Sequence, residues 1–216
     1  MRVTINGGGE GLRESLGSVV DVVPGDDKDA TLVVTVGEEP LSAAAAHSEQ
    51  RPVVPVGLDA AWSPSCEALP ELLASLADRS VPTVDARPLV VSVDGAQSTA
   101  AFDTTLVTSE PARISEYAVS VGSRPHAAFR ADGVVIATPL GSHGYTRAAG
   151  GPQLAFGTGL AVVPIAPFAT NPDHWLVADE GLQLSVERDE AAVTLFADDR
   201  AISTVAVLDE SQPRFP

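Results

Sequence analysis

The first 84 residues alternate between short apolar runs and longer amphipathic runs. Continuous apolar runs are typical of strands in a parallel sheet, because both faces of such a sheet are covered. The segments between them repeat apolar residues at helical spacing, and Pro70 interrupts the last of them early. We expect strands at 1–5, 30–36 and 51–58 and helices at 10–20, 39–50 and 66–79. This alternation predicts an α/β domain over residues 1–84.

The pattern changes after residue 83, where helical spacing nearly vanishes and short β-rich runs take over. Turn dipeptides such as Asp94-Gly95 and Asp132-Gly133 separate several of these runs. One helix is expected near 145–154. We expect strands at 87–93, 102–109, 114–122, 126–138, 159–167, 182–188, 191–198 and 202–208. The pattern predicts a mostly antiparallel, all-β domain over residues 85–216.

Charge changes the picture of the surface. The chain has 29 acidic and 13 basic residues, Lys28 is its only lysine, and its net charge is −16. A simply acidic protein is one interpretation, but near-absence of lysine favours adaptation to concentrated salt, because near 1 M the Debye length falls to about 3 Å. No basic stripe is present to meet nucleic-acid phosphates. No apolar run is long enough to span a membrane, and we expect a cytoplasmic protein.

Several features of the chain suggest chemistry only weakly. Cys66 stands alone, so it can form no internal disulfide, and we expect it to be a small packing residue. The four histidines have no metal-ligand spacing, so no metal site is predicted. Gly7 to Gly9 lie between a strand and a helix, where a phosphate loop could form, but they match neither GxGxxG nor a P-loop. A flexible turn is the expectation there.

Residues 131–154 form the most informative segment. An apolar strand runs into a glycine-rich bend, and such bends expose backbone N–H groups that can hold anions or ribose oxygens. A tyrosine ring can also pack along a nucleotide. Taken by itself, the segment is either a structural turn or a ligand site. The residues that could contribute to a ligand site are Thr138, Gly141, Ser142 and Tyr145.

The segment resembles the motif of the NAD kinase family, whose usual form is DG, four apolar residues and TPTGSTAYSLSAGGP. The flanking stretches RPLVVSVDG, AFDTTLVT and GLAVVPIAP also resemble that family, and the resemblance covers roughly residues 31–205. It is strongest from 131 to 167. The matching motif residues are Asp132, Gly133, Thr138, Pro139, Gly141, Ser142, Tyr145, Ala149, Gly150, Gly151 and Pro152.

The resemblance implies an α/β domain, a β domain and NAD bound between them. It implies transfer of a terminal phosphate from ATP or polyphosphate to the ribose 2′-hydroxyl of NAD, with Mg²⁺ balancing the phosphate charge. It also implies a homodimer or homotetramer. The implied ligand-binding positions are Gly37, Asp103, Asp132, Thr138, Gly141, Ser142, His143, Gly144 and Tyr145. Of these, Asp103 stands in the family's Asn-Glu pair, and His143 and Gly144 replace its Thr-Ala.

The family's phosphate-side signature GGDGT is replaced by GEEPL at residues 37–41. Glu39 falls on the aspartate and could act as general base. Pro40 has no N–H to offer a phosphate, and we expect it to push Glu39 toward an extended backbone. Glu38 brings a negative charge toward a negative ligand, which costs on the order of 4 kcal/mol per charge pair at 4 Å. Alternatively, both acids simply lie in the first turn of a helix, where they suit its dipole.

These observations leave three functions open. The first is an active but divergent NAD kinase with Glu39 as its catalytic residue. The second is a binding protein that holds NAD(H) or NADP(H) without phosphorylating it. The third is a structural or regulatory subunit that pairs with an active kinase, which no residue supports directly. We take the first as the working interpretation, because the match over 131–167 outweighs the altered loop.

Overall fold

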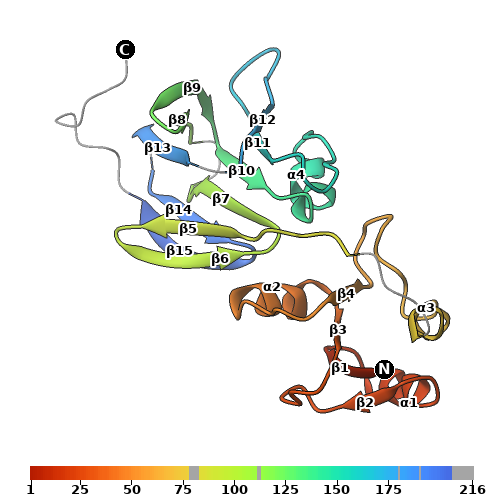
Figure 1. The fold of residues 1–216 in the computed structure, drawn as a ribbon. Coiled ribbons are helices and arrows are strands. Elements are labelled where there is room, and N and C mark those ends of the chain that lie inside the picture. Colours follow the sequence, from red (N-terminus) through yellow and green to blue (C-terminus); the bar gives the residue numbers. More distant parts are fainter. Residues whose placement is uncertain (78–82, 111–112, 180, 190, 206–216) are drawn as a thin grey trace. The chain divides into compact units, whose positions relative to one another are not determined.

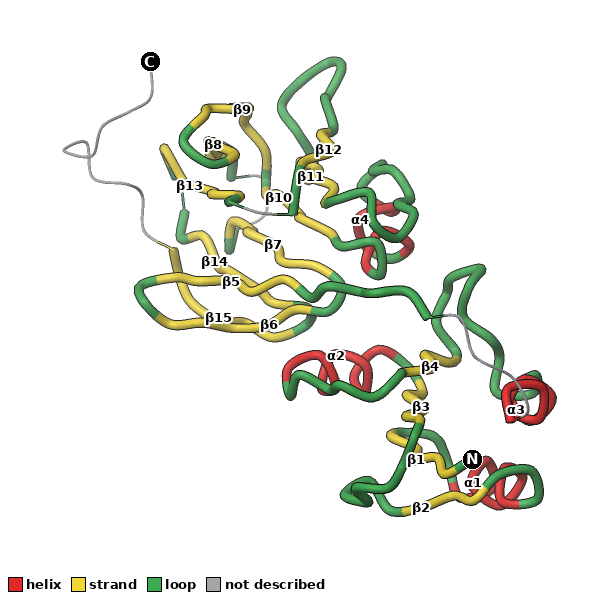
Figure 2. The backbone as a smooth tube through the Cα atoms, viewed as in Figure 1, coloured by secondary structure: helices red, strands yellow, loops and turns green. Residues whose placement is uncertain are grey.

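The computed structural model describes residues 1–77, 83–110, 113–179, 181–189 and 191–205 (Figures 1 and 2). The chain divides into two compact units, Met1–Val84 and Asp85–Pro216. Each unit has a hydrophobic core of its own. The predicted fold class, an α/β unit followed by a mostly β unit, is confirmed.

The first unit is built on a four-stranded parallel sheet in the order β2-β1-β3-β4. One helix follows β1, one follows β3 and one follows β4, as the alternating sequence pattern predicts. The element bounds are β1 (Arg2–Asn6), α1 (Glu10–Gly17), β2 (Asp21–Val23), β3 (Leu32–Val36), α2 (Glu38–Ala46), β4 (Val53–Val56) and α3 (Leu69–Ala77).

The core of this unit comes from alternate side chains of the strands. Val3 of β1 and Val34 of β3 are fully buried and pack with Leu16 of α1 and with Leu69 and Leu73 of α3. Strand residues alternate between the two faces of a sheet. The neighbouring positions 4 and 35 therefore face the other way, and both hold buried threonines. Both faces of β1 and β3 are thus covered, as the continuous apolar runs indicate.

Three details of the first unit differ from the sequence prediction. The short edge strand β2 was not predicted, because only two of its three residues are apolar. Helix α1 ends at Gly17 rather than at residue 20. Helix α3 begins at Leu69 rather than at residue 66, so Pro70 occupies its first turn. A missing N–H costs no intrahelical hydrogen bond in that turn.

The second unit consists of antiparallel sheets. Six strands form one sheet in the order β12-β11-β10-β7-β14-β15, three form a second sheet in the order β13-β8-β9, and β5 pairs with β6 as a hairpin. The bounds are β5 (Leu89–Val93), β6 (Ala96–Ala100), β7 (Asp103–Thr108), β8 (Ser115–Val121), β9 (Arg124–Ala131), β10 (Gly133–Ala137), β11 (Leu160–Ile165), β12 (Trp175–Val177), β13 (Leu182–Arg188), β14 (Val193–Ala197) and β15 (Arg200–Val205).

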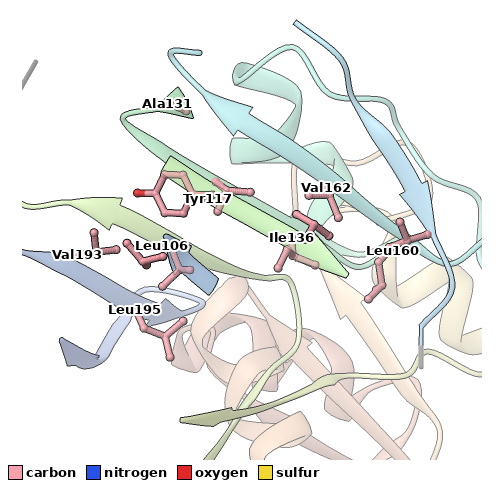
Figure 3. Close-up of a cluster of buried hydrophobic side chains, with 12 residues drawn as sticks. Leu106, Tyr117, Ala131, Ile136, Leu160, Val162, Val193 and Leu195 are labelled. Atoms are coloured by element: carbon pink, nitrogen blue, oxygen red, sulfur yellow. The ribbon is translucent and has the colours of Figure 1, made fainter. Parts of the chain in front are cut away.

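The main core of this unit lies on one face of the six-stranded sheet. Leu106 of β7 and Ile136 of β10 meet the fully buried ring of Tyr117 of β8 there (Figure 3). The opposite face carries Val135 and Val163, which pack with the segment that follows β10. Strands β10 and β11 are therefore buried on both faces, which explains their unbroken apolar sequences.

The β unit also corrects several predictions. The predicted strand at 126–138 is two strands, β9 and β10, because the chain bends at Asp132. Strands β6 and β12 were not predicted. The helix expected at 145–154 is the short α4 (Tyr145–Ala148), preceded by the 3₁₀ turn η1 (Gly141–His143). The predicted turn at Asp94-Gly95 does join β5 to β6, with positive φ at both residues, as a type I′ hairpin requires.

Candidate functional site

The turn after β10 is anchored by Thr138. Its hydroxyl lies 2.7 Å from the carbonyl oxygen of Ala101 and 3.0 Å from that of Phe102. Its N–H donates to the same Phe102 oxygen at 2.9 Å, and its hydroxyl oxygen accepts the Gly141 N–H at 3.3 Å. Thr138 is fully buried. Its hydroxyl therefore holds the turn, and its role as a ligand contact stays a prediction.

Ser142 ties the same turn to the chain before β11. It is fully buried, and its hydroxyl donates to the carbonyl of Pro139 at 2.9 Å. The same oxygen accepts the N–H of Leu154 at 2.9 Å, and the Ser142 N–H donates to the carbonyl of Thr138 at 3.0 Å. This hydroxyl too bonds within the chain and holds the turn in shape, and its predicted ligand contact stays a prediction.

Two motif glycines are required by close backbone packing. A Cβ on Gly141 would lie 2.1 Å from the carbonyl oxygen of Phe102. A Cβ on Gly151 would lie 2.6 Å from Cγ2 of Val163 and 2.8 Å from Cγ2 of Thr146. Real Cβ atoms do not approach other atoms so closely, and only glycine fits at either position. These matches with the family motif therefore record how the turn packs.

The exposed side of the turn is formed by its next three residues. His143 is half-buried, Gly144 is exposed, and the Tyr145 ring is 49% exposed at the start of α4. Of the predicted ligand residues in this segment, these three are the ones whose surfaces solvent can reach. The tyrosine presents an aromatic face on which a base or sugar could pack.

Asp103 lies beside the turn because β7 pairs with β10. Asp103 is the partner of Ala137 in the antiparallel register, directly before Thr138. It is partly exposed, and its carboxylate accepts the Thr105 hydroxyl at 3.3 Å. Thr104, which holds the second position of the family's Asn-Glu pair, is buried and donates its hydroxyl to the carbonyl of Phe196 at 2.7 Å. Of the two positions of that pair, only Asp103 carries a carboxylate.

Asp132 lies at the opposite end of β10 from the turn. Its N–H donates to the carbonyl of Ile165 at 3.0 Å, and its carbonyl accepts the N–H of Thr108. Strands rise about 3.3 Å per residue, so the six steps from Asp132 to Thr138 separate them by roughly 20 Å. Within one chain, the structure does not bring Asp132 together with the other predicted ligand residues of the β unit.

A residue that the sequence prediction missed holds residues 101–103, on which the turn packs. The carboxylate of Asp198, in the loop between β14 and β15, accepts three backbone N–H groups. The distances are 3.1 Å to Ala101, 2.8 Å to Phe102 and 3.3 Å to Asp103. The only signal in the sequence is an acidic pair after an apolar strand, which predicts a hairpin turn and nothing about its partners.

A pocket borders the turn within the β unit. Its volume is about 380 Å³, within the usual range of small-molecule sites. Thr138, Pro139 and Leu140 form part of its wall. Arg87 and Asp179, which also line it, are paired at 3.3 Å. The turn of the family motif thus faces a space that could accept part of a ligand.

The loop after β3 in the first unit holds the candidate catalytic residue. Gly37 has φ of +87° and donates its N–H to the carbonyl of Val56 at 2.9 Å. Glu38 and Glu39 are exposed in the first turn of α2. The expectation that Pro40 forces Glu39 into an extended backbone is wrong. Pro40 stands in the first helical turn, where its missing N–H has no intrahelical partner to lose. Both acids lie at the positive end of the helix dipole.

The turn at Gly7 to Gly9 lies beside that loop. Gly7 and Gly8 have φ of +80° and +68°, and the Arg13 guanidinium donates to the carbonyls of Ile5, Gly7 and Gly8 at 3.0–3.2 Å. A Cβ on Gly7 would lie 2.9 Å from Cγ of Pro40. Strand order reverses between β1 and β3, and ligands of open α/β sheets bind outside such a switch point.

Fold and loops together define a class of protein. A parallel α/β unit with glycine turns at its switch point precedes an antiparallel β unit with a glycine-rich turn beside a pocket. Loops of this kind can hold nucleotide phosphates and sugars. Within the described residues no three His, Cys, Asp or Glu side chains are arranged to hold a metal ion. No helix among them combines the length and apolarity that crossing a membrane requires.

Comparisons with known proteins make the class specific. Residues 103–207 match the family model of the ATP-NAD kinase C-terminal domain. The NAD kinase of Methanosarcina barkeri is 35% identical over 101 residues, and that of Methanosarcina acetivorans is 34% identical over 101 residues. Each match covers 45% of this chain and 37% of the relative's length. The second unit thus matches the C-terminal domain of ATP-NAD kinases, and the chain spans little more than a third of the length of these relatives.

Solved structures share the fold over nearly the whole chain. An NAD kinase from Archaeoglobus fulgidus, solved in complex with ATP, has a TM-score of 0.73 at 21% identity. The similarity covers 95% of this chain and 87% of that one. Yeast NADH kinase complexed with NADH has a TM-score of 0.69 at 15% identity, covering 96% and 77%. Because they cover 95–96% of this chain, these likenesses in fold include its first unit.

Proposed function

We propose that this protein is a divergent NAD kinase, which transfers the terminal phosphate of ATP or polyphosphate to the ribose 2′-hydroxyl of NAD. The observation that carries the proposal is the turn after β10. Its residues match the family motif, and Gly141 packs on Phe102 while the Thr138 hydroxyl donates to the Phe102 carbonyl. Cytoplasmic location and assembly into a homodimer or homotetramer belong to the same proposal and rest on the family resemblance.

On the dinucleotide side, the exposed groups beside the turn would contact NAD. The Tyr145 ring offers a stacking surface, and the Asp103 carboxylate can accept a hydrogen bond from a ribose hydroxyl. His143 and Gly144 directly precede Tyr145 and belong to the same exposed surface. Thr138, Gly141 and Ser142 would contribute indirectly, because their hydrogen bonds fix the backbone that presents these groups.

On the donor side, Glu39 is the proposed general base. Its carboxylate would take the proton of the 2′-hydroxyl while that oxygen attacks the terminal phosphorus, and the shortened donor would leave with the bond electrons. Mg²⁺ bound to the phosphates of the donor would balance their charge. The N–H of Gly37 is not available to the donor, because it donates to Val56.

One observation favours an alternative, a dinucleotide-binding protein without turnover. Pro40 offers no N–H to a phosphate, and its ring lies against Gly7 in the place where the family has a glycine. Glu38 adds a negative charge at the same helix end. Both changes weaken a phosphate site and leave the turn after β10 untouched, so binding could outlast catalysis.

The test uses the full chain in molar KCl. NAD is incubated with Mg–ATP or Mg–polyphosphate, and NADP is measured for the wild type, Glu39→Gln and the neighbouring control Glu38→Gln. NADP from the wild type and Glu38→Gln, but not from Glu39→Gln, supports the kinase with Glu39 as base. Equal turnover in Glu39→Gln removes that role.

A melting curve separates the remaining outcomes, because a ligand that binds only the folded state must raise the melting temperature. Stabilisation by NAD without NADP formation selects the binding protein. If millimolar NAD leaves the melting temperature unchanged and no NADP forms, both functions are overturned.

A further inference from the structure

In the loop between β14 and β15, a single carboxylate accepts hydrogen bonds from three backbone N–H groups. Oδ1 of Asp198 accepts from Phe102 at 2.8 Å and from Asp103 at 3.3 Å, and Oδ2 accepts from Ala101 at 3.1 Å. The contact is reciprocal, since the Asp198 N–H donates to the carbonyl of Asp103 at 2.8 Å. An ionised acceptor strengthens each of these hydrogen bonds. Residues 101–103 are therefore fixed by a residue from a distant part of the chain.

The same segment, 101–103, also contacts the turn after β10 through its carbonyl groups. Thr138 donates its hydroxyl to the carbonyls of Ala101 and Phe102, and Gly141 lies directly on the Phe102 carbonyl. Peptide groups are planar, so fixing the N–H groups of 102 and 103 also fixes the direction of the carbonyls of 101 and 102. One continuous set of hydrogen bonds thus runs from Asp198 through the segment 101–103 to the turn after β10.

A comparison within the same unit shows that the turn geometry alone does not require this carboxylate. Asp94 also has a left-handed backbone, with φ of +50° against +51° for Asp198, and it also joins two antiparallel strands. Its carboxylate is exposed and makes no hydrogen bond within the described residues. An aspartate in a hairpin turn is ordinary. Three backbone N–H groups converging on one are not explained by the hairpin.

We propose that Asp198 is a positioning residue for the dinucleotide side of the site. It acts through backbone N–H groups. By holding them it fixes the position of the Asp103 carboxylate and of the Ala101 and Phe102 carbonyls on which the Thr138–Ser142 turn packs. The consequence for ligand binding rests on the function proposed above. The structural part does not, because it concerns hydrogen bonds within the chain.

The test compares Asp198→Asn with Asp94→Asn. Asparagine tolerates the left-handed backbone as well as aspartate does and has nearly the same shape, so both variants should fold. Asp198→Asn replaces one acceptor oxygen by an N–H₂ group that faces the N–H of Ala101. Amide hydrogen exchange is measured for segments 101–103 and 138–142, and NAD affinity is measured by calorimetry in molar KCl.

For Asp198→Asn, we expect exchange in both segments to accelerate about tenfold or more and NAD affinity to fall by a similar factor. Asp94→Asn should match the wild type in both measurements. Unchanged exchange at 101–103 in Asp198→Asn would overturn the proposal. Faster exchange with unchanged NAD affinity would overturn the positioning role and leave only a structural one.

Two further measurements keep the test decisive. Thr138→Val cuts the same set of hydrogen bonds at its other end, so exchange should accelerate at 138–142 while 101–103 stays protected. The wild type alone suffices if Asp198→Asn does not fold, because rapid exchange of its 101–103 amides would contradict their being held. A wild type that binds no NAD removes the proposed function, while the exchange data still decide whether Asp198 anchors the turn.

Discussion

Gly141 lies directly on the carbonyl oxygen of Phe102, where a Cβ would come within 2.1 Å of that atom. We expect Gly141→Ala to force the turn away from β7 and to destabilise the β unit by about 3 kcal/mol. Gly144→Ala is the matched control, since the nearest atom to its Cβ would be 3.8 Å away. Urea unfolding of both variants measures the difference. Equal midpoints would show that the turn does not rest on Phe102.

The same substitution should have opposite effects at two buried threonines. Thr35 is fully buried with no hydrogen-bond partner for its hydroxyl within the described residues, whereas the Thr138 hydroxyl donates to two carbonyls. We expect Thr35→Val to stabilise the protein by about 1 kcal/mol, because it removes an unsatisfied buried hydroxyl. Thr138→Val should destabilise it by about 2 kcal/mol, because it leaves buried carbonyls with weaker pairing. Denaturant midpoints decide, and changes of the same sign in both variants would contradict this account.

The pair Glu49–Arg51 makes stability depend on acid pH. The Arg51 guanidinium contacts both oxygens of Glu49 at 2.7–2.8 Å, and this hydrogen bonding lowers the pKa of Glu49 from 4.5 to about 2. A carboxyl whose folded-state pKa is lowered stabilises the fold above its unfolded pKa, and this stability is lost as pH falls from about 4.5 toward 2. Solvent screening at this partly exposed pair reduces the contribution to about 1–2 kcal/mol.

We therefore expect Glu49→Gln to cost about 1–2 kcal/mol at pH 7 and almost nothing near pH 2. The control is Glu110→Gln, because Glu110 meets Arg113 at 3.5 Å with both side chains more than half exposed. That change should cost less than about 0.5 kcal/mol at any pH. The measurement is the free energy of unfolding across the acid range. A pH-independent cost of Glu49→Gln would rule out this assignment.

Salt should stabilise the whole protein. The net charge of −16 repels itself across the surface, and raising KCl from about 0.1 M to 2 M shortens the Debye length from about 10 Å to below 3 Å. We expect the melting temperature to rise steadily over that range and to level off once screening is complete. A melting temperature that falls with KCl, or does not change, would contradict the inferred adaptation to concentrated salt.

Sequence pattern predicted those elements whose residues are buried on both faces. Strands β3, β10 and β11 have unbroken apolar runs, so they were found, whereas β6 reads AQSTA and β12 has three residues. These two strands exist because neighbouring strands pair with them, and a polar sequence in β6 or three residues in β12 carry little signal. Pattern also joined β9 to β10, since a bend at Asp132 adds no polar break long enough to be noticed.

The candidate site was predictable as a segment but not in the roles of its side chains. The motif located the turn at 138–145 correctly, but it could not show that the hydroxyls of Thr138 and Ser142 bond within the chain. Those roles depend on Ala101 and Leu154, which reach the turn only through strand pairing. Asp198 escaped prediction for the same reason, because its N–H partners lie nearly a hundred residues earlier. Contacts of that range are set by topology.

The anchoring of residues 101–103 by Asp198 also fixes an order of events during synthesis. A ribosome releases the Thr138 turn well before it releases the β14–β15 hairpin, so the nascent turn can bond to Phe102 before the Asp198 carboxylate is present to accept the Phe102 N–H. Domains fold as their chains emerge. The pocket wall therefore reaches its final form only when the last strands of the unit are translated, and a chain cut off before Asp198 would carry the family motif without a finished site.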